Sequence, residues 1–286
     1  MCENYGRKSN AGAATHMYKR SSLVRMKGVT FVAIYLADIK DCKKKGTSLR
    51  TYTLYVPEGM HWTGGAHMRV ALYEGLSPEL AQKIKKADKE TRCALLTGIT
   101  EADFDPAFTR TFSISTRECD NAIVFSTRIA AEPSLFKKTL GEYQVGDGIF
   151  ILTSATHLHV PPKGPIVALT MGVGLSSLHA FIRDLLEAGG DGPILSLNVA
   201  EPLEELTELE VHDERVRYMY KNNRYSFEQA VKKLMEDRVL VEQGRFIVIG
   251  GHRFMKEWIA FLEDNGVAQD RIFLDRPDEQ RAIYIK

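Results

Sequence analysis

The feature that most constrains the fold is a change of pattern at the proline- and glycine-rich segment 160–165 (VPPKGP). Before it, apolar residues occur in short alternating runs such as 29–35, 51–56 and 122–126, separated by turns that contain glycine or proline. Alternation with β-branched and aromatic residues is typical of strands. Many short strands without helices between them favour an antiparallel barrel or sandwich. Residues 78–89 are the exception and are predicted to form one helix, inserted into the barrel or capping it.

After this segment, short apolar strands alternate with helices. The predicted strands are 165–170, 194–198 and 245–249, and the predicted helices are 175–188, 227–236 and 255–264. Strands that alternate with helices indicate a parallel sheet covered on both faces. We therefore expect an α/β plus all-β chain with two domains. Residues 1–22 would be a flexible N-terminal tail, 23–162 an antiparallel β-barrel and 163–286 a parallel-sheet α/β domain.

Composition excludes several classes of protein. The 286 residues are 44% apolar and 26% charged, as in soluble globular proteins. Basic residues exceed acidic ones by only one, so no global field attracts nucleic acid. The four cysteines have no iron–sulfur or zinc spacing, and no run approaches the roughly 18 apolar residues of a membrane span. We expect a cytoplasmic protein with no secretory signal, no membrane span and no nucleic-acid partner.

The segment 110–116 (RTFSIST) places an arginine, an aromatic ring and hydroxyls close together on one predicted strand. Alternate side chains of a strand share a face, so Arg110, Phe112 and Ile114 would point one way and the hydroxyls at 111, 113 and 115 the other. A guanidinium binds a diphosphate, and an aromatic ring stacks on a flat cofactor. Taken alone, these residues favour an ordinary strand that carries a surface arginine.

The same segment resembles the flavin motif R-x-[YF]-S-x-x-S of the ferredoxin-NADP reductase family, with Thr116 in place of the last serine. Segments 62–68, 128–140 and 141–149 resemble further parts of that family's barrel, in the family's order. The resemblance implies that the barrel binds FAD, with Ser113 as the catalytic residue nearest to flavin N5. The implied FAD-binding residues are Arg110, Phe112, Ser113, Ile114, Ser115, Arg128 and Ser134.

Two glycine turns lie in the predicted α/β domain, each between a strand and a helix. Glycines at such a turn let the backbone approach a pyrophosphate, and the helix start supplies N–H donors. Segment 170–177 (TMGVGLSS) resembles the family's G-[TV]-G-[IL]-[AS]-P, with Ser177 at the proline position. Segment 246–255 (FIVIGGHRFM) resembles V-C-G-P-x-x-M, with Gly250 at the cysteine that sits beside the nicotinamide and His252 at the proline. The implied nucleotide-binding residues are Thr170, Gly172, Val173, Gly174, Gly250, Gly251 and Met255.

The departure at Gly250 implies a vacancy beside the nicotinamide, which would slow hydride transfer unless His252 or Phe254 fills part of it. A basic cluster, formed by Arg215, Arg217, Lys221 and Arg224, lies at a further predicted strand in segment 212–218. In the family, NADPH users hold the 2′-phosphate near this place, so Arg217 and Arg224 are candidate ligands and NADPH is favoured over NADH. A solvated basic loop is the alternative.

Two other kinds of site receive little support. His157 and His159 are two residues apart and could share one face of a strand, as two metal ligands would. No third ligand accompanies them, so we expect no metal. Ser113, His67 and Asp103 could be assembled into a hydrolase triad, but the chain has no G-x-S-x-G motif.

The resemblance implies an FAD-dependent NAD(P)H oxidoreductase that transfers electrons from a nicotinamide nucleotide through FAD to a separate acceptor. That acceptor would be a carrier of the ferredoxin or flavodoxin type, or a small molecule, since no haem or iron–sulfur domain is expected on this chain. A flavin-holding electron-transfer subunit and a nucleotide-binding module without turnover remain as alternatives. The oligomeric state is left open.

Overall fold

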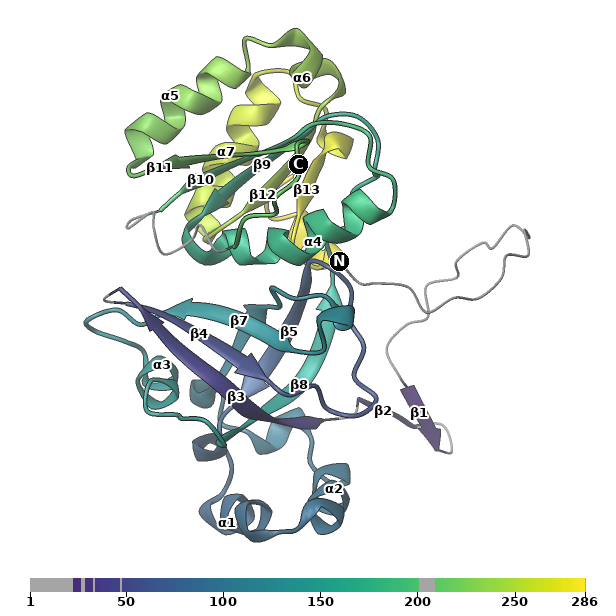
Figure 1. Cartoon of the computed structure of the whole chain (residues 1–286), viewed down its shortest axis with the longest axis vertical. Helices are drawn as coiled ribbons and strands as arrows, with labels where there is room; N and C mark the ends of the chain where they lie inside the picture. The colour runs from purple at the N-terminus through teal and green to yellow at the C-terminus, as the bar shows by residue number, and fades with distance from the viewer. Residues whose placement is uncertain (1–22, 27–28, 33, 47, 201–208, 286) are drawn as a thin grey trace.

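The computed structural model describes residues 23–26, 29–32, 34–46, 48–200 and 209–285. Figure 1 shows an all-β domain in the middle of the molecule, an α/β domain above it and a pair of small helices below it. The tail expected at 1–22 lies outside the described residues. The two domains expected from the change of pattern are therefore both present.

The all-β domain is a six-stranded antiparallel sheet in the order β6-β5-β8-β3-β4-β7. Its strands are β3 (Tyr35–Lys45), β4 (Leu49–Leu54), β5 (Ala66–Ala71), β6 (Thr109–Ser113), β7 (Ile123–Arg128) and β8 (Gly148–Thr156). The sheet curls until its outer strands meet, and the N–H of Ser115 donates to the carbonyl of Val124 at 2.8 Å. Tyr52, Met68 and Phe125 are fully buried inside this curl. Strands β1 (Leu23–Met26) and β2 (Val29–Val32) form a separate hairpin.

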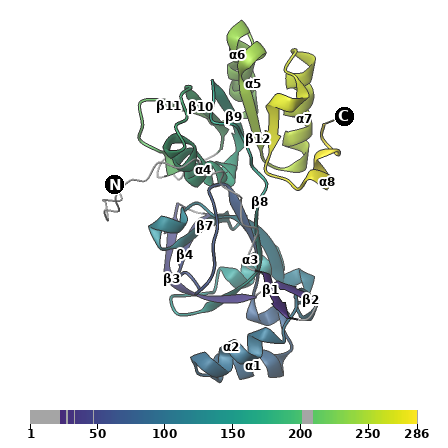
Figure 2. The same cartoon turned by 90° about the vertical axis from the view of Figure 1, so that its right-hand side faces the viewer.

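The helical insertion differs from the single helix expected at 78–89. It consists of α1 (Pro78–Lys86) and α2 (Lys89–Thr97), with Ala87 and Asp88 between them. The Asp88 carboxylate accepts a hydrogen bond from the N–H of Thr91, so it caps the start of a second helix. Both helices lie at the end of the barrel opposite the α/β domain (Figures 1 and 2). The insertion is therefore remote from the junction between the domains.

The α/β domain has a five-stranded parallel sheet in the order β11-β10-β9-β12-β13. The strands are β9 (Ile166–Met171), β10 (Ile194–Val199), β11 (Val216–Lys221), β12 (Arg245–Ile249) and β13 (Ile272–Leu274). The helices are α4 (Leu175–Glu187), α5 (Arg224–Leu234), α6 (Arg238–Gln243), α7 (His252–Asp264) and α8 (Asp278–Arg281). Alternate residues of β9 pack in opposite directions, with Ala168 in the core under α4 and Leu169 in the core under α5 and α7. Figure 2 shows these helices on the two faces of the sheet, as expected from the sequence.

The strand order reverses direction beside β9. The chain adds β10 and β11 on one side of β9, then crosses over to place β12 and β13 on the other side. In open parallel sheets, ligands bind at the carboxyl ends of the strands where the order reverses. Here those ends are Met171 of β9 and Ile249 of β12, and each is followed by a glycine turn. The expected domain boundary after residue 162 lies between β8, which ends at Thr156, and β9.

A small α3 helix (Leu135–Leu140) completes the barrel. Ser134 accepts a hydrogen bond from the N–H of Lys137 and so caps its start. Phe136 and Leu140 of this helix are fully buried, and the Tyr52 hydroxyl donates to the carbonyl of Leu140 at 2.8 Å. These contacts fix α3 against the barrel core.

Candidate functional site

A cavity of about 620 Å³ lies between the barrel and the carboxyl edge of the parallel sheet. From the barrel, it is lined by His67, Arg69, Thr111, Phe112, Ser113, Ser126, Thr153, Ala155 and His157. From the α/β domain, it is lined by Met171, Val173, Gly174, Ser176, Ser177, Ile249, Gly250, Gly251, Asp275, Arg276, Pro277 and Gln280. Both glycine turns therefore face the flavin-like segment of the barrel across one shared space.

Strand register determines which barrel side chains reach this cavity. Ser113 of β6 pairs with His67 of β5, and Thr111 pairs with Arg69. Side chains of paired residues lie on one face of a sheet, so this face presents hydroxyls and basic groups to the cavity. The ring of Phe112 packs against the barrel core, with its centroid 4.8 Å from the ring centroid of Phe125. Its remaining exposed part lines the cavity.

The next two residues of the motif are buried in the barrel. Ile114 is part of its apolar core, and Ser115 is 2% exposed. The hydroxyl of Ser115 has no hydrogen-bond partner among the described residues. Neither residue lines the cavity, although both were expected to contact FAD.

A basic corner lies beside α3, formed by Arg110 and Lys137. The Arg110 guanidinium lies 5.7 Å from the ring centroid of Phe136, and the Lys137 ammonium donates to the carbonyl of Arg128 at 2.7 Å. Burial lowers the pKa of Lys137, and the nearby Arg110 charge lowers it further. Two positive charges at this corner favour the binding of an anion. Lys137 was missed in the sequence, because its partial burial and its bond to the Arg128 carbonyl, which distinguish it from the exposed Lys138, depend on the fold.

Two hydrogen bonds from Asn198 hold the first glycine turn in place. The side-chain amide of Asn198 donates to the Thr170 hydroxyl at 2.7 Å and to the carbonyl of Gly172 at 3.1 Å. Gly172 has φ of 58°, a left-handed conformation that favours glycine. A side chain at Gly174 would lie 3.1 Å from the carbonyl oxygen of Ile249. Thr170 and Gly172 therefore shape the turn, while Val173 and Gly174 face the cavity.

The second glycine turn corrects one expectation from the sequence. A Cβ at Gly250 would lie 2.6 Å from Cδ1 of Phe254. The predicted vacancy is therefore wrong, because the buried Phe254 ring fills the space that a cysteine would need. Met255 is fully buried in the core between α7 and the sheet and does not line the cavity.

Two hydrogen bonds join the domains at the cavity wall. The Ser177 hydroxyl at the start of α4 donates to the Ser113 hydroxyl at 2.5 Å. His67 Nε2 lies 3.1 Å from a carboxylate oxygen of Asp275, which follows β13. The Asp103 carboxylate instead accepts from the N–H of Thr100, so it takes no part in the triad considered above.

His157 lies near this second contact, with its ring centroid 6.3 Å from that of His67. Burial lowers the pKa of His157, and His67 and His159 lower it further. No group of three or more potential metal ligands occurs within the described ranges. His67 and His157 both line the cavity.

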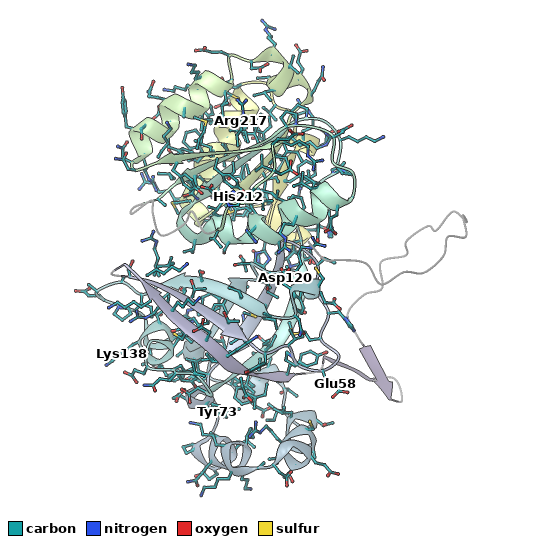
Figure 3. The ribbon with its side chains drawn as sticks, in the orientation of Figure 1. Glu58, Tyr73, Asp120, Lys138, His212 and Arg217 are labelled. Atoms are coloured by element: carbon teal, nitrogen blue, oxygen red, sulfur yellow. The ribbon has the colours of Figure 1, made fainter. Side chains whose placement is uncertain are left out.

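Ion pairs clamp the domains together beside the cavity. Arg183 of α4 binds the Asp120 carboxylate through both terminal nitrogens, at 2.6 and 2.8 Å. Arg117 of the barrel binds Asp184 at 2.8 Å and also binds Glu187. Figure 3 shows Asp120 at the junction between the two domains. These contacts fix α4, and with it the first glycine turn, relative to the barrel.

The basic cluster is divided between the two ends of β11. Arg215 precedes the strand and binds Asp213 at 2.7 Å. Arg217, near the amino end of the strand, is exposed and lies high on the α/β domain, away from the junction (Figure 3). Lys221 and Arg224 lie at the carboxyl end, where β11 ends and α5 begins. Only these last two lie at the carboxyl edge of the parallel sheet.

No protein-family model and no curated protein matches the chain. Solved structures do match. A ferredoxin NADP+ reductase from Neisseria gonorrhoeae with bound FAD and NADP is 15% identical, with a TM-score of 0.64 over 85% of this chain and 98% of the other. A mutant ferredoxin-NADP+ reductase from Plasmodium falciparum is 11% identical, with a TM-score of 0.60 over 84% and 94%. A siderophore-interacting protein from Aeromonas hydrophila is 17% identical, with a TM-score of 0.57 over 88% and 96%.

The chain therefore has the two-domain fold of ferredoxin-NADP reductase-like proteins, which confirms the fold that its motifs implied. The similarity extends over both domains, since it covers most of each chain. Among the helices that the structure describes, none is long and apolar enough to cross a membrane.

Proposed function

We propose that this protein is an FAD-dependent NAD(P)H oxidoreductase that passes electrons to a separate acceptor. The observation that carries the proposal is the shared cavity, in which Phe112 and Ser113 of the barrel face Gly174 and Gly250 of the α/β domain. One side carries the residues of the flavin-like motif. The other is the strand edge where parallel sheets bind nucleotides.

The residues of the barrel fit FAD. Arg110 and Lys137 offer two cations to a diphosphate, and charge-assisted contacts of this kind are stronger than neutral ones. The exposed part of Phe112 offers an aromatic surface on the cavity wall. The similar gonococcal structure contains FAD and NADP. When bound, FAD would accept a hydride and release electrons one at a time.

The protein's own residues would position the reactants and exclude water. Ser113 presents a hydroxyl to the cavity, and the contacts of Ser177 and Asp275 seal the junction behind it. The absence of a side chain at Gly174 lets this turn pack closely against Ile249 of β12, and the start of α4 that follows offers N–H donors to a pyrophosphate. Such positioning supplies much of the rate enhancement when two reactants must meet in one geometry.

We propose NADPH as the preferred nucleotide. Lys221 and Arg224 place two cations at the carboxyl end of β11, and Arg224 pairs only weakly, at 3.4 Å, with Glu257. A 2′-phosphate would bring two negative charges to this edge, which NADH lacks. The acceptor would be a carrier of the ferredoxin or flavodoxin type or a small molecule.

The test combines cofactor uptake with turnover. Purified protein should take up FAD at micromolar concentration and then oxidise NADPH, with ferricyanide as a small-molecule acceptor. Protein that takes up FAD but oxidises neither nucleotide would instead be an electron-transfer subunit. Protein that takes up no FAD would be a nucleotide-binding module at most, and the proposal would be wrong.

A further inference from the structure

Ser177 makes the shorter of the two hydrogen bonds that join the two halves of the cavity, 2.5 Å against 3.1 Å for His67 and Asp275. It lies on the first turn of α4, directly after the glycine turn, and its exposed fraction is 0%. Its hydroxyl makes one hydrogen bond in the described part of the chain, to the Ser113 hydroxyl at 2.5 Å. A buried hydroxyl without a partner is unfavourable, so this bond holds both serines in one arrangement.

The direction of this bond determines what Ser113 can offer to a ligand. A serine hydroxyl has one proton and two lone pairs. Ser177 donates its proton to Ser113, so one lone pair of Ser113 is occupied. The proton of Ser113 is then free to point into the cavity that this residue lines. Ser113 is thereby oriented as a hydrogen-bond donor toward whatever ring the cavity holds.

We propose that Ser177 is a positioning residue, which fixes Ser113 as a donor to a ring nitrogen of the flavin and ties its orientation to the nucleotide-binding turn. The proposal rests on the function proposed above. Ser177 follows Gly174 by three residues on the same helix start, so any shift of this turn moves the Ser177 hydroxyl. The clamp from Arg183 to Asp120 limits such shifts, which keeps the contact short. A proline at this position, as in the family motif that segment 170–177 resembles, could not donate this bond.

A double-mutant cycle tests the coupling directly. The variants are Ser177→Ala, Ser113→Ala and the double variant, with Ser196→Ala as the control. Ser196 is also a buried serine of the α/β domain, at 1% exposed, but it does not line the cavity. The readouts are FAD affinity, the absorbance spectrum of the bound oxidised flavin, and the rate of flavin reduction by NADPH.

Ser177→Ala should leave FAD affinity nearly unchanged, alter the flavin spectrum in the same direction as Ser113→Ala, and slow reduction by about 2- to 10-fold. The double variant should be no slower than Ser113→Ala, because both changes remove one coupled contact. Ser196→Ala should match the unmodified protein. Ser177→Thr keeps the hydroxyl and should restore most of the rate.

Additive losses in the double variant, or an unchanged flavin spectrum in Ser177→Ala, would overturn the positioning role. Thermal unfolding of each variant separates this result from misfolding, since a purely structural role would lower stability without moving the spectrum. An unmodified protein that binds no FAD would instead contradict the proposed function. The two failures are therefore distinguishable.

Discussion

At the scale of single residues, Gly250 shows why a motif position cannot be interpreted without its neighbours. The sequence has a glycine where the motif that segment 246–255 resembles has a cysteine, and a missing side chain suggests space. Phe254, four residues later on α7, turns its ring into that space. The sequence offers His252 and Phe254 as side chains that could fill this space, but it does not decide between them, because the direction of a ring depends on packing from the rest of the domain.

Gly250→Ala should therefore destabilise the protein by about 1–3 kcal/mol, as overpacked core positions do. Its Cβ would lie 2.6 Å from the Phe254 ring. Gly251→Ala is the matched control, because its Cβ would lie 3.4 Å from Cε of Met171, an ordinary contact. Urea unfolding of both variants gives the comparison. Equal stability of the two would show that Phe254 moves aside without cost.

The basic corner gives a second test at this scale. Arg110→Ala and Lys137→Ala should each weaken FAD binding by about tenfold to a hundredfold, since each removes a charge-assisted contact of about 1.5–3 kcal/mol. Lys138→Ala is the control, because Lys138 follows Lys137 in the chain but is exposed. Fluorescence titration with FAD measures all three. Loss of affinity in Lys138→Ala equal to that in Lys137→Ala would show only a general effect of charge.

At the scale of elements, alternation of apolar residues predicted most strands and the crossover helices, because a buried face imposes its period on the sequence. It missed α2, whose start depends on the Asp88 cap, and β13, which has only three residues. The interpretation of the sequence also treated the basic cluster at residues 215–224 as one site. The bounds of β11 and α5 show that Arg217 lies near the amino end of β11, whereas Arg224 lies beyond its carboxyl end, at the start of α5.

The preference for NADPH over NADH should depend on the two cations at the carboxyl end of β11 and not on Arg217 at its amino end. Lys221→Ala and Arg224→Ala should raise KM for NADPH and leave KM for NADH nearly unchanged, because only NADPH carries the 2′-phosphate. Arg217→Ala, at the amino end of β11, should change neither value and serves as the control. Steady-state kinetics with NADPH and with NADH give both KM values for each variant. If Arg217→Ala has the larger effect on NADPH, the nucleotide does not bind at the carboxyl edge.

At the scale of the whole molecule, the ion pairs at the junction make stability depend on pH. Burial alone would raise the pKa of Asp120, but hydrogen bonds from Arg183 and from the N–H of Arg117 bring it below its ordinary value. A carboxyl with a lowered pKa in the folded state stabilises the fold above its unfolded pKa, about 4. That contribution is lost as the pH falls through the folded pKa.

Asp120→Asn should therefore lower the Tm at pH 5 to 7, and the difference from the unmodified protein should shrink as the pH falls below about 4. Thermal unfolding across this pH range measures it. Glu187, whose pKa is lowered by its hydrogen bond with Arg117, should follow the same trend in Glu187→Gln. A difference that stays constant down to pH 3 would mean that these carboxylates contribute no charge-dependent stability.

The two-domain fold follows from the sequence pattern, whereas the site arises only when both domains meet. Ser113 and Ser177 are 64 residues apart in the chain, and His67 and Asp275 are 208 residues apart. No local pattern links such distant positions. The motifs thus located each half of the cavity, but the contacts between the halves, including Asp275, could be found only in the folded structure.

The central claim is that one cavity brings a flavin and a nicotinamide together. The most direct measurement is rapid anaerobic mixing of FAD-loaded protein with NADPH while the flavin absorbance is followed. We expect the oxidised flavin band to bleach in a single-turnover phase that saturates with NADPH concentration and slows in Ser113→Ala. A flavin that binds tightly but stays oxidised in the presence of both NADPH and NADH would contradict the account.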